Sequence, residues 1–172
     1  YDSDRGKAAI PGGTLLGNSI WKDFQENGGS ELIGKTAGIP SELALAAQIL
    51  RNPYFEVMRV FFVKDGKIID HTAWTSRLPG AVNFPDTKKT EVLARMTTSG
   101  ADGYYLLHNH PNGFSTPSSK DEQLTRDVAD QMAGFKGHVV IDHNEYSVID
   151  KHGVSKKFNT PTQQPQHAPE VA

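Results

Sequence analysis

The 172-residue chain contains no cysteine, so neither disulfides nor thiolate metal ligands are available to it. No apolar run approaches the roughly 20 residues of a membrane helix, and no basic and apolar signal peptide opens the chain. These absences predict no membrane-spanning segment within these residues and exclude a cysteine-based metal site. We expect a cytoplasmic protein that makes no membrane contacts.

Runs of lysine or arginine are also missing, and the formal net charge is −2. Proteins that bind nucleic acid through its phosphates usually concentrate basic side chains on one face. The even mixture of charges therefore predicts no strong binding to DNA or RNA.

Composition indicates one domain with polar ends, because 37% of the residues are hydrophobic and 22% are charged. Both ends are rich in glycine, proline and polar residues without periodicity. We expect a linker or lid over residues 1–39, a folded domain over 40–152 and a disordered tail over 153–172. The chain begins with Tyr1 rather than methionine, so we also expect a domain of a larger protein.

Hydrophobic residues at helical spacing predict three helices. The first follows Pro40, with Ser41 as its N-cap and Pro53 as its end. The other two are predicted over residues 85–98 and 118–133, each followed by a glycine that can end a helix.

Between the helices, short segments rich in β-branched and aromatic residues predict strands. Residues 56–63 form a nearly continuous apolar run, which is typical of a strand covered on both faces. A hairpin turn at Asp65-Gly66 joins it to a partner over 67–74. Further strands are expected over 104–110, 138–142 and 146–149. The pattern predicts an α/β domain with a mixed, largely antiparallel sheet flanked by helices.

The stretch LLHNHPNGFSTPSSKD, residues 106–121, carries the chemistry. If residues 104–110 form a strand, side chains alternate between its faces and His108 and His110 point the same way. Asp121, on the helix that follows, can add a carboxylate oxygen. Two histidines and one carboxylate with an open fourth position are the ligand set of a catalytic zinc site.

Other interpretations of these residues remain open. The same ligand set binds Fe(II) in non-haem iron proteins. Ser118 and Asp121 also have the spacing of a capping box, as do Ser119 and Glu122, and such a pair can serve only to hold the helix end.

The spacing H-x-H, seven residues, S, two residues, D resembles the signature of the JAMM (JAB/MPN+) metalloproteases. Its four positions are occupied by His108, His110, Ser118 and Asp121. The sequence HNHPNG…TPSSKD is most similar to the RadC-like branch, and the similarity runs from about Pro40 to about Lys151. The resemblance implies a curved sheet flanked by helices, in a cytidine-deaminase-like layered fold, with Zn²⁺ at the edge of the sheet.

The resemblance also implies catalytic roles. The Ser118 hydroxyl would steady the oxyanion that forms at the attacked carbonyl. The family requires an upstream glutamate as general base, and we assign this role to Glu56 at the head of the apolar strand. Glu42 and Glu91 are the alternatives, and both are predicted to lie within helices.

Three positions near the ligands, Asn109, Asn112 and Phe114, depart from family patterns. Asn109 stands where many peptidase members carry a small hydroxyl residue, on the strand face opposite the ligands. Phe114 differs from the usual RadC-like residue and could either face a substrate or pack the loop. The remaining histidines have no ligand spacing and are expected to be ordinary surface or strand residues: His71, His138, His143, His152 and His167.

The resemblance favours a zinc-dependent metallopeptidase or isopeptidase that acts on a protein or peptide, with ubiquitin-like conjugates as one implied substrate class. Only the N-terminal region and residues 74–86 could grip such a substrate. The alternative is a nucleic-acid-associated module of a larger mobile-element or DNA-repair protein. The charge balance ranks this alternative second, and the complete ligand set disfavours a metal-free scaffold.

Overall fold

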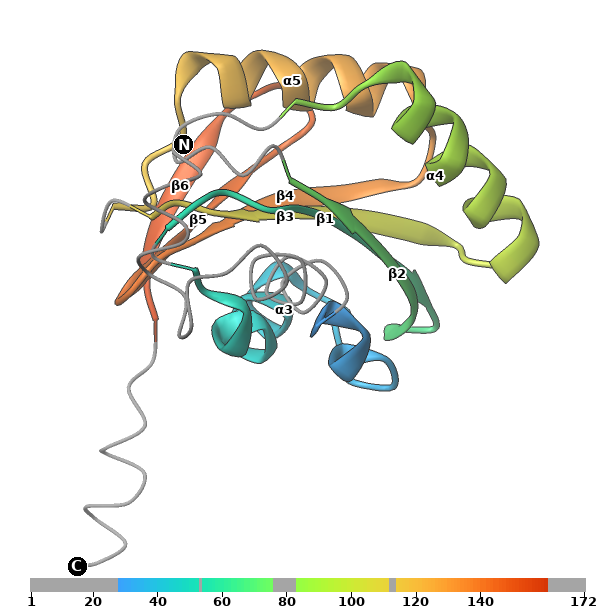
Figure 1. Ribbon diagram of the computed structural model, residues 1–172, viewed down its shortest axis with the longest axis horizontal. Coiled ribbons are helices and arrows are strands. Elements are labelled where there is room, and N and C mark those ends of the chain that lie inside the picture. The colour runs from blue at the N-terminus through green and yellow to red at the C-terminus, as the bar shows by residue number, and fades with distance from the viewer. Residues whose placement is uncertain (1–27, 53, 76–82, 112–113, 161–172) are drawn as a thin grey trace, which may run out of the picture.

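The computed structural model describes residues 28–52, 54–75, 83–111 and 114–160. Within them, helices cover both faces of a six-stranded sheet (Figure 1). The elements in chain order are η1 (Gly28–Leu32), α3 (Pro40–Ala46), η2 (Ala47–Leu50), β1 (Met58–Lys64), β2 (Lys67–Trp74), α4 (Asp86–Ser99), β3 (Gly103–Asn109), α5 (Ser119–Gln131), β4 (Phe135–Ile141), β5 (Glu145–Ile149) and β6 (Ser155–Asn159).

The strands lie in the order β2-β1-β3-β4-β5-β6. Only β3 and β4 are parallel among these pairs, and α5 supplies the crossover that a parallel connection requires. In Figure 1, α4 and α5 lie on one face of the sheet and α3 lies on the other. The predicted α/β fold with a mixed, largely antiparallel sheet is confirmed.

Two hydrophobic cores explain the continuous apolar run in β1. Phe61 of β1 and Leu107 of β3 belong to the core on the α3 side. Phe62 and Leu106 belong to the core beneath α4 and α5. Because both faces are covered, six of the seven β1 residues are buried.

Local backbone signals predicted several element ends correctly. Asp65 and Gly66 have positive φ angles of 51° and 76°, as a tight hairpin turn between β1 and β2 requires. Gly100 ends α4 in the left-handed conformation, with φ 76°. None of the helices in the described part of the chain has the length and apolarity needed to cross a bilayer.

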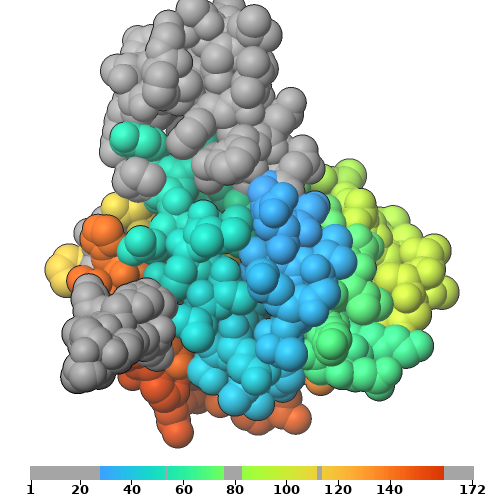
Figure 2. Space-filling view, turned by 90° about the horizontal axis from the view of Figure 1, so that it is seen from below, coloured from blue at the N-terminus to red at the C-terminus, as the bar shows by residue number. Residues whose placement is uncertain are grey.

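The segment before α3 is part of the packed domain. Leu32 and Ala37 have no exposed area and join the core on the α3 side, while Thr36 forms a bridge to the start of β2. Figure 2 shows this segment and α3 spread across the same face of the molecule. The prediction of a linker or lid is therefore wrong for residues 28–39, and residues 1–27 lie outside the described part.

The predicted disordered tail is wrong for Ser155–Asn159, which form the edge strand β6. This strand is polar and mostly exposed, so it carries no hydrophobic pattern. Backbone pairing with β5 holds it in place. The Phe158 ring also stacks on Tyr146 at a centroid distance of 5.2 Å. Residues 161–172 lie outside the described part.

The helix after Ile39 begins differently from the prediction. Ile39 occupies the N-cap position without a side-chain hydrogen bond, and Pro40 is the first helical residue. Ser41 therefore lies inside the first turn, and its assignment as N-cap is wrong. After Ala46 the chain tightens into the 3₁₀ helix η2, which ends at Leu50.

The contact between η1 and β2 gives a stability prediction. A Cβ atom on Gly29 would overlap the buried imidazole of His71, whereas one on Gly28 would meet only Leu50 Cδ2 at 3.8 Å. We expect Gly29→Ala to lower the free energy of unfolding by about 1–3 kcal/mol in urea denaturation. Gly28→Ala is the matched control and should be close to wild type. Equal stability of the two variants would show that η1 does not pack against His71.

Candidate metal centre

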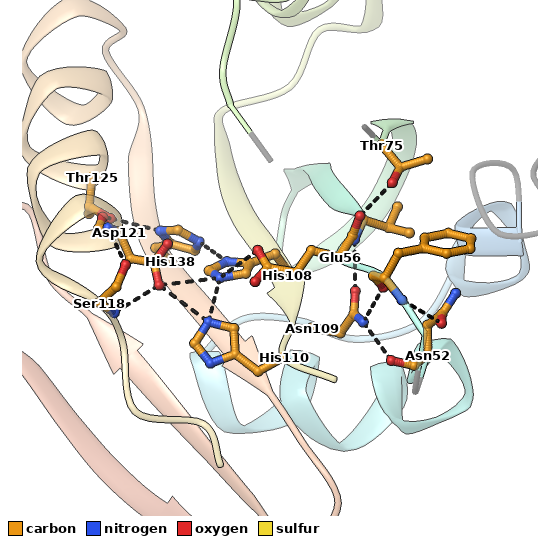
Figure 3. Close-up of polar contacts among 12 residues, drawn as sticks. Asn52, Glu56, Thr75, His108, Asn109, His110, Ser118, Asp121, Thr125 and His138 are labelled. Atoms are coloured by element: carbon orange, nitrogen blue, oxygen red, sulfur yellow. Dashed lines mark hydrogen bonds and ion pairs between the residues drawn. The ribbon is translucent and has the colours of Figure 1, made fainter. Parts of the chain in front are cut away.

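The predicted site residues come from three segments that the sheet brings together. Antiparallel pairing places Met58 of β1 opposite His108 of β3, so Glu56, just before β1, lies beside the end of β3. His110 follows β3 directly, and α5 presents Asp121 from its first turn. Figure 3 shows these side chains converging at the ends of the central strands.

The ring nitrogens and the carboxylate meet closely. His108 Nε2 lies 3.0 Å from His110 Nε2. Asp121 Oδ2 lies 3.5 Å from the first nitrogen and 3.2 Å from the second. Glu56 Oε1 stands slightly further out, 4.0 Å from His108 Nε2. Glu56, His108 and His110 each offer a ligand atom within 4.8 Å of the others, so this group could hold a metal ion.

A chain of buried hydrogen bonds sets the tautomer of His108. The Thr125 hydroxyl donates to the Asp121 carbonyl at 2.7 Å, so its oxygen accepts from His138 Nδ1–H, also at 2.7 Å. Burial, with the charge of neighbouring His108, lowers the pKa of His138 well below its ordinary value. Neutral His138 therefore accepts at Nε2 from His108 Nδ1–H, 2.7 Å away. When the His108 ring is neutral, the lone pair of its Nε2 faces the site.

The second histidine is oriented by the backbone. His110 Nδ1 lies 3.0 Å from the Phe114 carbonyl oxygen, which can only accept, so Nδ1 carries the proton. His110 Nε2 then also presents a lone pair when the ring is neutral. Phe114 is 63% exposed, and its contact with His110 is made by its main-chain carbonyl.

His138 was missed by sequence reasoning, and the prediction that it is an ordinary histidine is wrong. It has no exposed area and lies between His108 and Thr125. No motif spacing marks it, because its link to His108 depends on β3 and β4 being parallel neighbours. Leu106 pairs with His138, so the side chains of His138 and His108 lie on the same face of the sheet.

Ser118 and Asp121 can serve both as a helix cap and as part of the candidate metal centre. Ser118 Oγ accepts from the Asp121 N–H at 3.0 Å, and Asp121 Oδ2 accepts from the Ser118 N–H at 2.9 Å, which forms a capping box. The same Oδ2 faces both histidines. The cap thus aims the carboxylate at the centre. Because the Ser118 hydroxyl accepts in the cap, its own proton stays available for donation.

The electrostatic environment separates the two carboxylates. Burial alone would raise the pKa of Asp121, but hydrogen bonds from His108 and His110 hold it well below its usual range. Burial raises the pKa of Glu56 above its ordinary value, although both histidines oppose the shift. Burial would lower the pKa of His110, but its bond to Asp121 and the charge of Glu56 raise it. Neighbouring carboxyl groups whose pKa values are shifted in opposite directions are typical of functional sites.

The two alternative glutamates lie in other surroundings. Glu42 Oε1 accepts from the Gly38 N–H at 2.8 Å and so closes the first turn of α3. Glu91 accepts from Thr72 and pairs with Arg95 on the surface between α4 and β2. Neither belongs to the group that could hold a metal ion.

The described part of the predicted substrate-gripping segment is used for packing. The Trp74 and Phe84 rings lie 4.8 Å apart, and Trp74 Nε1 donates to the Asn83 carbonyl at 2.6 Å. Both rings belong to the core beneath α4 and α5. Residues 76–82 lie outside the described part.

Comparison with known families identifies the class of protein. Residues 43–154 match the family described as RadC-like JAB domain, and the chain belongs to this family. The resemblance noted from the H-x-H and S-x-x-D positions is therefore confirmed. The JAB family includes metallohydrolases, which agrees with a buried group able to hold a metal ion.

The chain is similar to several curated proteins named UPF0758. It is 33% identical over 111 residues to one from Thioalkalivibrio sulfidiphilus, covering 62% of this chain and 48% of that protein. It is 26% identical over 150 residues to one from Fusobacterium nucleatum, covering 82% and 64%. One from Desulfitobacterium hafniense is 33% identical over 79 residues, covering 44% and 35%. The chain thus spans about a third to two thirds of the length of these relatives.

Proposed function

We propose that this domain is a zinc-dependent metallopeptidase or isopeptidase that hydrolyses a peptide or isopeptide bond. The observation that carries the proposal is the convergence of two imidazole nitrogens and one carboxylate oxygen within 3.5 Å of one another. A buried glutamate stands next to them. Membership of the RadC-like JAB family supports a hydrolase.

The donor set of His108, His110 and Asp121 fits zinc. Bonds of about 2.0–2.1 Å in a tetrahedral arrangement place ligand atoms about 3.3–3.4 Å apart. The three separations here are 3.0, 3.2 and 3.5 Å. Both imidazoles have Nδ1 engaged with a protein acceptor, which leaves Nε2 for the metal. A zinc ion held there would polarise the scissile carbonyl and lower the pKa of water towards about 7.

The remaining residues supply proton transfer and charge stabilisation. Glu56, whose pKa is raised by burial, would take a proton from the attacking water and return it to the leaving amine. Ser118 is held at the start of α5 by its cap, so its O–H can be aimed in advance at a developing oxyanion. Peptide and Lys-linked isopeptide bonds are both secondary amides, and the same chemistry serves either.

The test is a cleavage panel of peptides and Lys-linked ubiquitin-like fusions. We expect hydrolysis that is lost on chelation, restored by zinc and unchanged by added DNA. Fluorescence anisotropy with labelled DNA across a salt series, run on the same preparation, should show only weak and salt-sensitive binding. Salt-resistant DNA affinity without cleavage of any amide would favour the nucleic-acid alternative. Iron in an anaerobic preparation would favour an oxygenase.

A further inference from the structure

The side chain of Asn109 links the metal-binding strand to the segment that carries Glu56. Asn109 follows His108 on β3, so its side chain lies on the opposite face of the sheet. Its Oδ1 accepts from the Val57 N–H at 2.9 Å. Its Nδ2 donates to the carbonyls of Asn52 and Phe55, each also at 2.9 Å. Figure 3 shows these bonds between the end of β3 and the chain before β1.

Both polar groups of the peptide that joins Glu56 to Val57, its N–H and its carbonyl, are hydrogen-bonded to side chains. Its N–H donates to Asn109, and its carbonyl accepts from the Thr75 hydroxyl at 2.5 Å. This peptide lies before β1, outside regular secondary structure. Its position therefore depends on side chains rather than on the sheet ladder.

Only an amide side chain can make the three bonds of Asn109. They need one acceptor and two N–H donors directed at two different carbonyls. Aspartate would keep the acceptor but turn an oxygen towards the carbonyls of Asn52 and Phe55. Serine would offer a single donor. Asn109 is 2% exposed, so water cannot replace the lost partners without entering the core.

We propose that Asn109 is a positioning residue, which fixes the distance between Glu56 and the metal centre. Its backbone lies between His108 and His110, while its side chain grips the loop that carries Glu56. One residue thereby ties the general base to the strand that presents two of the metal ligands. This inference rests on the proposed function, in which Glu56 transfers the proton.

Asn109→Ala tests the proposal in the full chain. A displacement of about 1 Å at a reacting group can cost about 100-fold in rate, so we expect kcat to fall about 100-fold with KM little changed. One zinc per chain should remain, because His108, His110 and Asp121 are untouched. Tyr104→Phe is the matched control on β3: it removes the buried bond to the Met132 carbonyl, 2.6 Å, and should leave kcat near wild type.

Hydrogen exchange gives a readout that does not need activity. Loss of the Asn109 bonds should speed exchange of the amides in residues 54–57 while zinc content stays the same. If the wild type cleaves nothing, the proposed function fails, but faster exchange with zinc retained still supports the positioning role. Unchanged exchange, wild-type kcat or loss of zinc in Asn109→Ala would each overturn it.

A second variant covers the case in which Asn109→Ala does not fold. Thr75→Val removes the hydrogen bond to the Glu56 carbonyl of the same peptide group, and valine is close to isosteric with threonine. It should also lower kcat and keep zinc. Wild-type kcat in a folded Thr75→Val protein, combined with unfolding of Asn109→Ala, would make Asn109 a stability residue and overturn the proposal.

Discussion

Replacing Glu56 with glutamine should abolish measurable hydrolysis while leaving the fold and the metal in place. The amide has nearly the shape of the carboxylate but cannot accept the proton of the attacking water. Loss of a general base costs about 10²–10⁴-fold in rate. Glu56 is 8% exposed, and burial has already raised the pKa of its carboxyl, which suits a group that gains and then returns a proton.

Kinetics and zinc analysis of the same preparation separate the outcomes for Glu56→Gln. Glu42→Gln is the matched control, because Glu42 only closes a helix turn through Gly38. Unchanged kcat in Glu56→Gln would place the base elsewhere, and a defect in the Glu42 variant would then identify it. Loss of zinc from Glu56→Gln would instead make Glu56 a ligand, since it belongs to the group that could hold the ion.

The sequence predicted the parts of the site that lie close together along the chain. The two-residue period predicted that His108 and His110 meet, although His110 lies one residue beyond the end of β3, and Asp121 follows from the spacing to the next helix. Glu56 was found through the apolar strand that it precedes. That strand begins at Met58, so Glu56 lies just outside the ladder.

What the sequence could not predict depends on contacts between distant segments. His138 reaches His108 only because β4 lies parallel to β3, and Thr125 joins them from α5. Asn109 was placed on the correct face, but its three partners lie more than 50 residues away. Edge strand β6 was missed because backbone pairing, rather than a hydrophobic pattern, holds it.

The supporting contacts also explain why the H-x-H motif alone is an incomplete description of the centre. His108 is buried, and its Nδ1, which points away from the proposed metal position, contacts His138. His110 is tied to the Phe114 carbonyl in the loop before α5. The loop, the crossover helix and strand β4 therefore orient the two imidazoles together. Residues outside the motif should consequently tune metal affinity.

His108→Ala should eliminate stoichiometric zinc and all hydrolysis, because it removes a fully buried side chain at the middle of the proposed donor set. Variants of the supporting residues should give a graded loss. Partners that orient a ligating histidine are typically worth about 10–100-fold in metal affinity. We expect His138→Gln to weaken zinc by about that factor, and Thr125→Val to weaken it less, because His138 keeps its contact with His108.

Zinc titration against a competing chelator measures this series. His143→Ala is the control, since His143 is exposed and contacts Arg51 rather than the centre. Equal zinc content in His108→Ala and wild type would show that the metal is not bound at the proposed position. Wild-type affinity in His138→Gln would show that the buried histidine chain does not act on the metal. We expect the loss of zinc affinity to be largest for the His108 variant, smaller for His138 and smallest for Thr125. The reason is that His138 acts on the ion through His108, and Thr125 acts through His138.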